Sequence, residues 1–72
     1  MRKNNKLKIK INGKNRFIKR KTSLKSLLET FNLPISKIAI ELNEQIVDKK
    51  KINNIKLKNK DKIEIVHFIG GG

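Results

Sequence analysis

The sequence contains no cysteine, tryptophan or tyrosine, and only one histidine and one proline among its 72 residues. Without cysteine it has no disulfide framework, no thiolate zinc site and no catalytic thiol, and one histidine leaves almost no side-chain metal chemistry. No run approaches the roughly 20 apolar residues of a membrane span, and no apolar segment follows the charged start as in a secretory signal. We therefore expect a cytoplasmic protein without a membrane segment or a bound metal.

A chain of 72 residues makes one domain near the lower size limit for independent folding, and its core is small. A deep enzyme pocket is therefore not expected. The single imidazole, His67, has no carboxylate or nucleophile spaced to work with it, so we interpret it as a packing or half-exposed residue. The sequence predicts no catalytic residue, and we expect a protein that is not an enzyme.

The charge is strongly one-sided, with 19 Lys and Arg residues against 6 Asp and Glu and a net charge of +13. Such a balance usually indicates nucleic acid or another anionic partner. Here 16 of the 19 cations are lysines, and they recur along the whole chain, as in KLKIKI, DKKK and KLKNKDK. The three phenylalanines are not spaced as a base-stacking platform. We interpret the charge mainly as a solvated surface, and nucleic-acid binding is disfavoured.

The first strong pattern is a strand followed by a tight turn. Residues 6–11, KLKIKI, alternate strictly between lysine and apolar side chains, which is typical of a strand with one buried face. The Asn-Gly pair at 12–13 favours a two-residue hairpin turn, after which residues 14–20 pair back antiparallel. Because Phe17 and Ile18 are adjacent, one of them has to face away from the core.

The period changes over residues 22–31, TSLKSLLETF. Four apolar side chains recur there at helical spacing: Leu24, Leu27, Leu28 and Phe31. Thr22 or Ser23 can cap the N-terminus, and Pro34 prevents continuation. We predict one helix of about three turns.

The rest of the chain returns to strand patterns. Residues 37–43, KIAIELN, alternate again, a short segment holds Ile46 and Val47, and residues 62–69, KIEIVHFI, form the last strand. The polar connector between them contains three apolar side chains predicted to fill the lower core: Ile52, Ile55 and Leu57.

A hairpin, one main helix and a last strand predict an α+β chain with the β-grasp (ubiquitin-like) fold. We expect a mixed sheet of four to five strands packed on the helix, with the last strand beside the first, because both are regularly apolar. Residues 1–69 would form this single domain, with 1–5 frayed, and residues 70–72 would form a flexible glycine tail.

The end of the sequence predicts a chemistry of its own. Gly70, Gly71 and Gly72 add nothing to a core, but without Cβ atoms they fit an extended chain into a narrow tunnel of a partner enzyme. The group that such a tail offers is its terminal carboxylate. A carboxylate is a poor acyl donor until ATP converts it to an acyl-adenylate, so the tail predicts a substrate for an activating enzyme.

Two stretches, IAIELNEQIV and LKNKDKIEIVHFIGGG, resemble the ThiS family, the sulfur carriers of thiamine biosynthesis. An ELN strand and turn, an IV step, a turn before IEIV and a terminal Gly-Gly follow in the family's order and spacing. The resemblance extends from the KIKINGK hairpin to Gly72. Lys60 departs from it, because the family usually has glycine there, which leaves open whether that turn uses positive φ.

The resemblance implies the following roles. The Gly72 carboxylate would be adenylated by a ThiF-type adenylyltransferase that consumes ATP, and a sulfur donor such as a cysteine desulfurase persulfide would convert it to a thiocarboxylate. The thiazole synthase ThiG would receive the sulfur. Gly70 and Gly71 would thread the partner's active site, and the carrier would hold no cofactor of its own.

The last strand also predicts a partner surface. If Ile63 and Ile65 face the helix, the intervening side chains face outward. With Phe17 they form an expected exposed patch near the tail: Phe17, Glu64, Val66, Phe68 and Ile69. The alternative is that Phe68 folds back over an open edge of the core.

Other functions stay open on the sequence. The same carrier chemistry serves molybdopterin synthase in MoaD-like proteins, and tRNA thiolation in ubiquitin-related modifiers, although the prolines usual before the glycines of molybdopterin carriers are missing here. A small basic RNA-binding β-grasp module is the alternative of a different class. One residue appended after Gly72 separates the classes, because it would abolish a carrier and leave an RNA binder unaffected.

The net charge of +13 generates a testable prediction about rate. A basic carrier approaches an acidic patch of its activating enzyme faster at low salt, so the rate of adenylation should fall as ionic strength rises. Initial rates measured across a salt series test this. An adenylation rate that does not change from low to high salt would contradict electrostatic steering of the carrier.

Overall fold

The computed structural model describes residues 5–68. Five strands, one α-helix and two 3-10 helices follow one another along the chain: β1 Lys6–Ile11, β2 Lys14–Lys19, α1 Leu24–Thr30, η1 Ile35–Lys37, β3 Ile38–Leu42, β4 Gln45–Ile46, η2 Lys49–Asn54 and β5 Lys62–His67. All the predicted strands are present. The unpredicted elements are η1 and η2, which form in stretches that have no helical period.

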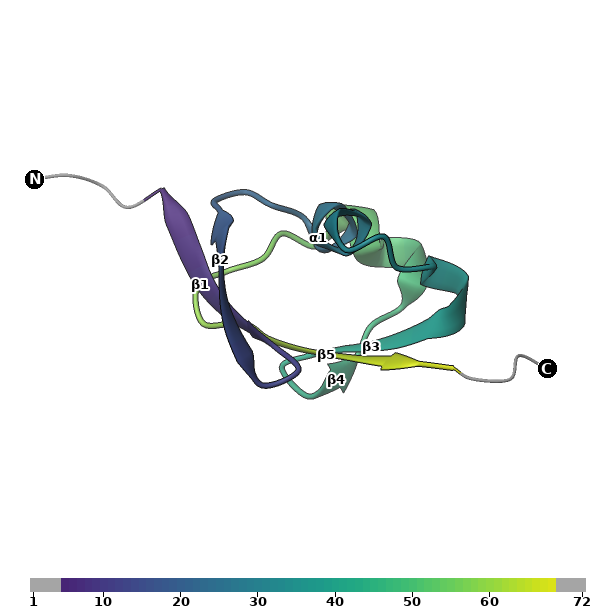
Figure 1. Cartoon of the computed structure of the whole chain (residues 1–72). Helices are drawn as coiled ribbons and strands as arrows, with labels where there is room; N and C mark the ends of the chain where they lie inside the picture. The colour runs from purple at the N-terminus through teal and green to yellow at the C-terminus, as the bar shows by residue number, and fades with distance from the viewer. Residues whose placement is uncertain (1–4, 69–72) are drawn as a thin grey trace, which may run out of the picture.

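The strands make one mixed sheet in the order β2-β1-β5-β3-β4. β1 pairs antiparallel with β2 and parallel with β5, while β3 pairs antiparallel with both β5 and β4. α1 and η2 lie together against one face of this sheet (Figure 1). This is the predicted β-grasp fold, with five strands and with the last strand beside the first.

The core forms between the sheet and α1. It consists of the apolar side chains predicted from the alternation along the strands and from the helical spacing of residues 22–31. Six of them are less than 2% exposed: Ile9, Leu24, Leu28, Ile38, Ile40 and Ile63. Ile52 of η2 and Leu57 close the core from the connector, as predicted, and Ile55 packs against it. Of the adjacent residues Phe17 and Ile18, Ile18 packs against the core and Phe17 faces outward.

α1 is shorter than predicted, with seven residues, which is about two turns. The hydroxyl of Ser23 accepts a hydrogen bond from the Ser26 N–H, so Ser23 is the N-cap. The helix ends before Pro34 because Asn32 adopts a left-handed φ of 55°, and its N–H donates to the Glu29 carbonyl. Phe31 therefore lies at the C-cap and not in the last turn.

Several turns use positive φ at residues other than glycine. Asn12 and Gly13 have φ of 49° and 84°, as expected for the predicted two-residue hairpin turn. Asn43 and Glu44 repeat this between β3 and β4, with φ of 53° and 72°. Lys60 also has positive φ, at 73°, so the turn before β5 keeps the conformation that glycine favours although lysine occupies it.

A small polar cluster joins the end of β3 to the start of β5. The Asn43 amide donates to Asp61 Oδ1 at 3.0 Å and accepts from the Lys62 N–H at 2.9 Å. Asp61 is only 8% exposed, and its other oxygen accepts from the Lys58 N–H at 2.7 Å. Asn43, from the ELN stretch, and Asp61, which precedes IEIV by two residues, therefore share a structural role. Together they fix the start of β5.

The conformation of Lys60 predicts a stabilising substitution. Lys60→Gly removes the steric cost of a left-handed L-residue, which outweighs the added entropy of the unfolded chain, and should raise the free energy of unfolding by about 0.5–1 kcal/mol. Urea unfolding followed by far-UV circular dichroism measures this, since the chain has no Trp or Tyr.

Lys58→Gly is the matched control in the same turn, because Lys58 does not have positive φ and glycine there only adds unfolded-state entropy. It should lower stability by about 0.5–1 kcal/mol. Equal effects of the two glycines would contradict the assignment of strain to Lys60.

Candidate functional site

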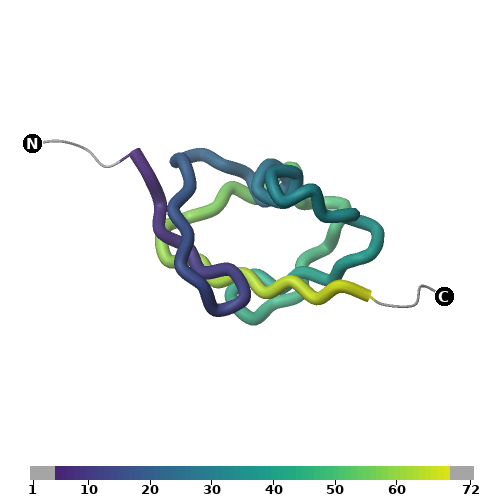
Figure 2. Tube along the Cα trace, viewed as in Figure 1, coloured from purple at the N-terminus to yellow at the C-terminus, as the bar shows by residue number. Residues whose placement is uncertain are grey.

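The predicted functional group lies beyond the end of β5. Ile69, Gly70, Gly71 and Gly72 fall outside the described residues, so the described part of the site ends at Phe68. β5 occupies the centre of the sheet between β1 and β3, and it ends on the side away from the start of β1 (Figure 2). The position and direction of β5 therefore decide where the tail begins.

A side chain of the hairpin turn clamps the second half of β5. Asn12 Oδ1 accepts from the Ile65 N–H at 2.7 Å, and Asn12 Nδ2 donates to the Ile65 carbonyl at 3.3 Å. The Asn12 N–H also donates to the Ile63 carbonyl at 2.9 Å. The turn thus continues the hydrogen bonding of β1 along β5. The sequence predicts only the turn role of Asn12, because no local signal reveals a partner more than 50 residues away.

Two contacts hold the last described residue. The Phe68 N–H donates to the Lys37 carbonyl at 2.8 Å, and the Lys49 ammonium lies 5.7 Å from the centre of the Phe68 ring. Lys49 is itself fixed, because its Nζ donates to the carbonyls of Ile35 and Ile38 at 3.2 and 2.8 Å. Lys49 was missed by sequence analysis, since it is one of 16 lysines and has no distinguishing pattern.

The outer face of the sheet, which is the face opposite α1, carries an exposed apolar patch near the end of β5. Val66 is 60% exposed there, while Ile63 is buried and Ile65 packs against the core. Glu64 is half-buried and lies opposite Glu41 on β3. The Phe68 side chain is 52% exposed, and its covered half includes the contact of its ring with the Lys49 ammonium.

Phe17 does not join this patch. It is 63% exposed on the outer face, but its register partner is Lys8, whose carbonyl accepts from the Lys60 N–H. Val66 lies six positions further along the parallel β5, which is roughly 20 Å at about 3.3 Å per residue. The expectation of one patch containing Phe17, Val66 and Phe68 is corrected by this register, which the sequence does not reveal.

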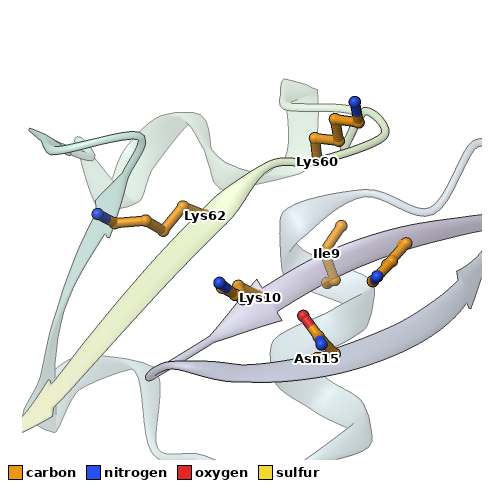
Figure 3. A pocket seen from close by; sticks show the side chains of 6 residues that line it. Ile9, Lys10, Asn15, Lys60 and Lys62 are labelled. Carbon is orange, nitrogen blue, oxygen red and sulfur yellow. The ribbon is translucent and has the colours of Figure 1, made fainter.

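Lysines surround the end of the outer face where Phe17 lies. A hollow of about 380 Å³ is lined by Lys8, Ile9, Lys10, Asn15, Lys60 and Lys62. Figure 3 shows that these side chains come from β1, β2, β5 and the turn before β5, and that Lys10 and Asn15 lie next to each other across β1 and β2. Lys62 pairs with Glu44 at 3.2 Å. The lining of the hollow is mostly cationic, and it comes from the start of β5 and not from its end.

The acidic and histidine side chains of the described residues are not grouped as a metal site. Within residues 5–68, no three His, Asp or Glu side chains are placed to hold a metal ion, and His67 is exposed without an ion-pair partner. No helix in that range is long and apolar enough to cross a membrane. What the arrangement provides is a rigid support that presents whatever follows Phe68.

The family model described as the ThiS family matches residues 9–72. The chain is 35% identical over 65 residues to the sulfur carrier protein ThiS of Bacillus subtilis (strain 168), a match that covers 89% of this chain and 98% of the relative. It is 36% identical over 66 residues to a thiazole synthase of Magnetococcus marinus, covering 92% of this chain but only 20% of that longer protein.

The fold has a close counterpart among solved structures. The crystal structure of the thiamine biosynthesis protein ThiS from Geobacter metallireducens superposes with a TM-score of 0.79 at 22% identity, covering 92% of this chain and 100% of that one. At this identity the likeness shows the fold alone. It confirms the predicted β-grasp arrangement around the site.

The contacts of Lys49 predict a specific loss of stability. Lys49→Met keeps the aliphatic stem but leaves the Ile35 and Ile38 carbonyls without their charged donor, and should lower the free energy of unfolding by about 2 kcal/mol. Lys50→Met is the control, because Lys50 is exposed and should change stability by less than about 0.5 kcal/mol. Denaturant unfolding compares the two, and equal effects would contradict the role of Lys49.

Proposed function

The chain belongs to the ThiS family, and on this premise we propose that it is a sulfur carrier protein of thiamine biosynthesis whose terminal residue, Gly72, bears the sulfur. The observation that carries the proposal is the family match, which runs from residue 9 to Gly72 and so includes both the β-grasp support and the glycines after it. The partner enzymes perform the chemistry, and the carrier supplies the acyl group.

The proposed reaction begins with the Gly72 carboxylate. In a ThiF-type adenylyltransferase, a carboxylate oxygen attacks the α-phosphorus of ATP, pyrophosphate leaves, and an acyl-adenylate forms. A sulfur nucleophile then attacks the acyl carbon and AMP leaves. Sulfide gives the thiocarboxylate directly, whereas a persulfide of the cysteine desulfurase type gives an acyl disulfide that a thiol reduces to the thiocarboxylate.

In this proposal the chain's own residues fix the end of β5 and offer a thin glycine tail to the partner enzyme. Asn12 and Lys49 hold the end of β5 in one direction, so the glycines start from a fixed point. Gly70, Gly71 and Gly72 have no side chains to obstruct a narrow active-site tunnel. The absence of cysteine also means that no internal thiol competes for the activated acyl carbon.

The proposed acceptor is thiazole synthase of the ThiG type. Two relatives named thiazole synthase, from Magnetococcus marinus and Paramagnetospirillum magneticum, contain a segment 36% identical to this chain within a much longer protein. A carrier joined to its acceptor in one chain supports a direct encounter of the two partners here. Molybdopterin synthesis and tRNA thiolation are then alternatives that an acceptor assay distinguishes.

Intact-protein mass spectrometry tests the proposal. After incubation with ATP, a ThiF-type adenylyltransferase of the same organism and a sulfide source, the mass should rise by the difference between one sulfur and one oxygen. Deletion of Gly72, or one residue appended after it, should abolish the gain because the acyl group is removed or displaced. An unchanged mass of the wild-type chain under these conditions would contradict the carrier role.

A further inference from the structure

A groove lies on the helix side of the sheet, at the end where β5 finishes. It is bounded by β1, β2 and β5 and by the residues that directly follow α1. Its volume is about 380 Å³. Four half-buried apolar side chains form its floor, and all of them also pack against the core: Ile11, Phe31, Leu33 and Ile65. The floor is therefore apolar and held in place by the core.

The rim of this groove is basic. Lys14 and Arg16 lie on β2 opposite Ile11 and Ile9, so they face the helix side, and His67 lines the groove from β5. The Arg16 guanidinium lies 5.1 Å from the centre of the Phe31 ring, which holds the cation above the apolar floor. None of the described residues that line the groove is acidic. The groove thus combines an apolar anchor site with uncompensated positive charge.

We infer that this groove is a docking site for a segment of thiazole synthase in which carboxylates flank an apolar side chain. The inference rests on the proposed function. An apolar side chain would cover the floor, and carboxylates beside it would pair with Lys14 and Arg16. The outer face of the sheet carries no such combination near the tail, because Glu41 and Glu64 lie beside Val66 there.

The distance to the tail supports a partner that also receives Gly72. His67 lines the groove, and Gly72 follows it by five residues, which span at most about 17 Å when fully extended. An enzyme that takes the terminal carboxylate into its active site therefore has its surface within reach of the groove. Thiazole synthase is the partner to which the relatives point, since a segment like this chain occurs within proteins of that name.

The test compares charge reversals on the two faces of one strand. Arg16→Glu and Lys14→Glu place a negative charge in the groove, whereas Lys19→Glu makes the same change in net charge on the outer face, opposite Lys6. Calorimetric titration of the full chain with thiazole synthase of the same organism should show a Kd raised about tenfold or more by each groove variant and less than twofold by the control.

Melting curves of the variants establish that they are folded, and thiocarboxylate formation by mass spectrometry keeps the two proposals distinguishable. Groove variants that accept sulfur normally but bind thiazole synthase weakly support the inference. If all three charge reversals raise the Kd equally, binding depends only on net charge and the docking site is overturned. Groove variants with the wild-type Kd would also overturn it. If the wild type still acquires sulfur in either case, the carrier function stands without this docking site.

Discussion

The parallel pairing of β1 with β5 is the interaction on which the rest of the molecule depends. It joins the first and last strands at the centre of the sheet, and β2 and β3 attach to its two sides. The Asn12 side chain extends this pairing, because it hydrogen-bonds both the N–H and the carbonyl of Ile65, 53 positions further along the sequence. Because so distant a contact closes a long loop, β5 reaches its place only when the intervening elements fold with it.

β5 is held by different means at its start, middle and end. The cluster of Asn43 and Asp61 sets where it begins, Asn12 aligns its second half, and the Lys37 carbonyl and Lys49 fix Phe68. Few of these contacts depend on apolar burial, which a domain of this size has little of. Polar bonds from turns thus hold β5 at its start, in its second half and at Phe68.

The two faces of the sheet acquire different characters at the end near the tail. The outer face combines Val66 with the carboxylates of Glu41 and Glu64, whereas the helix side combines an apolar floor with Lys14, Arg16 and His67. A chain with a net charge of +13 therefore still has a distinct distribution of charge on the two faces of the sheet at the end of β5.

The sequence by itself determined the order of the strands and helix and the buried faces, because alternation, helical period and the Asn-Gly turn are local signals. For the glycine end it supplies a prediction of chemistry. The sequence pattern did not show that the left-handed Asn32 ends α1 two residues before Pro34. Tertiary structure alone decided that Phe17 lies far from Val66, that Lys49 supports Phe68 and that Asn12 binds Ile65. These facts depend on strand register and on contacts between distant residues, where one lysine or asparagine differs from another only by its neighbours in space.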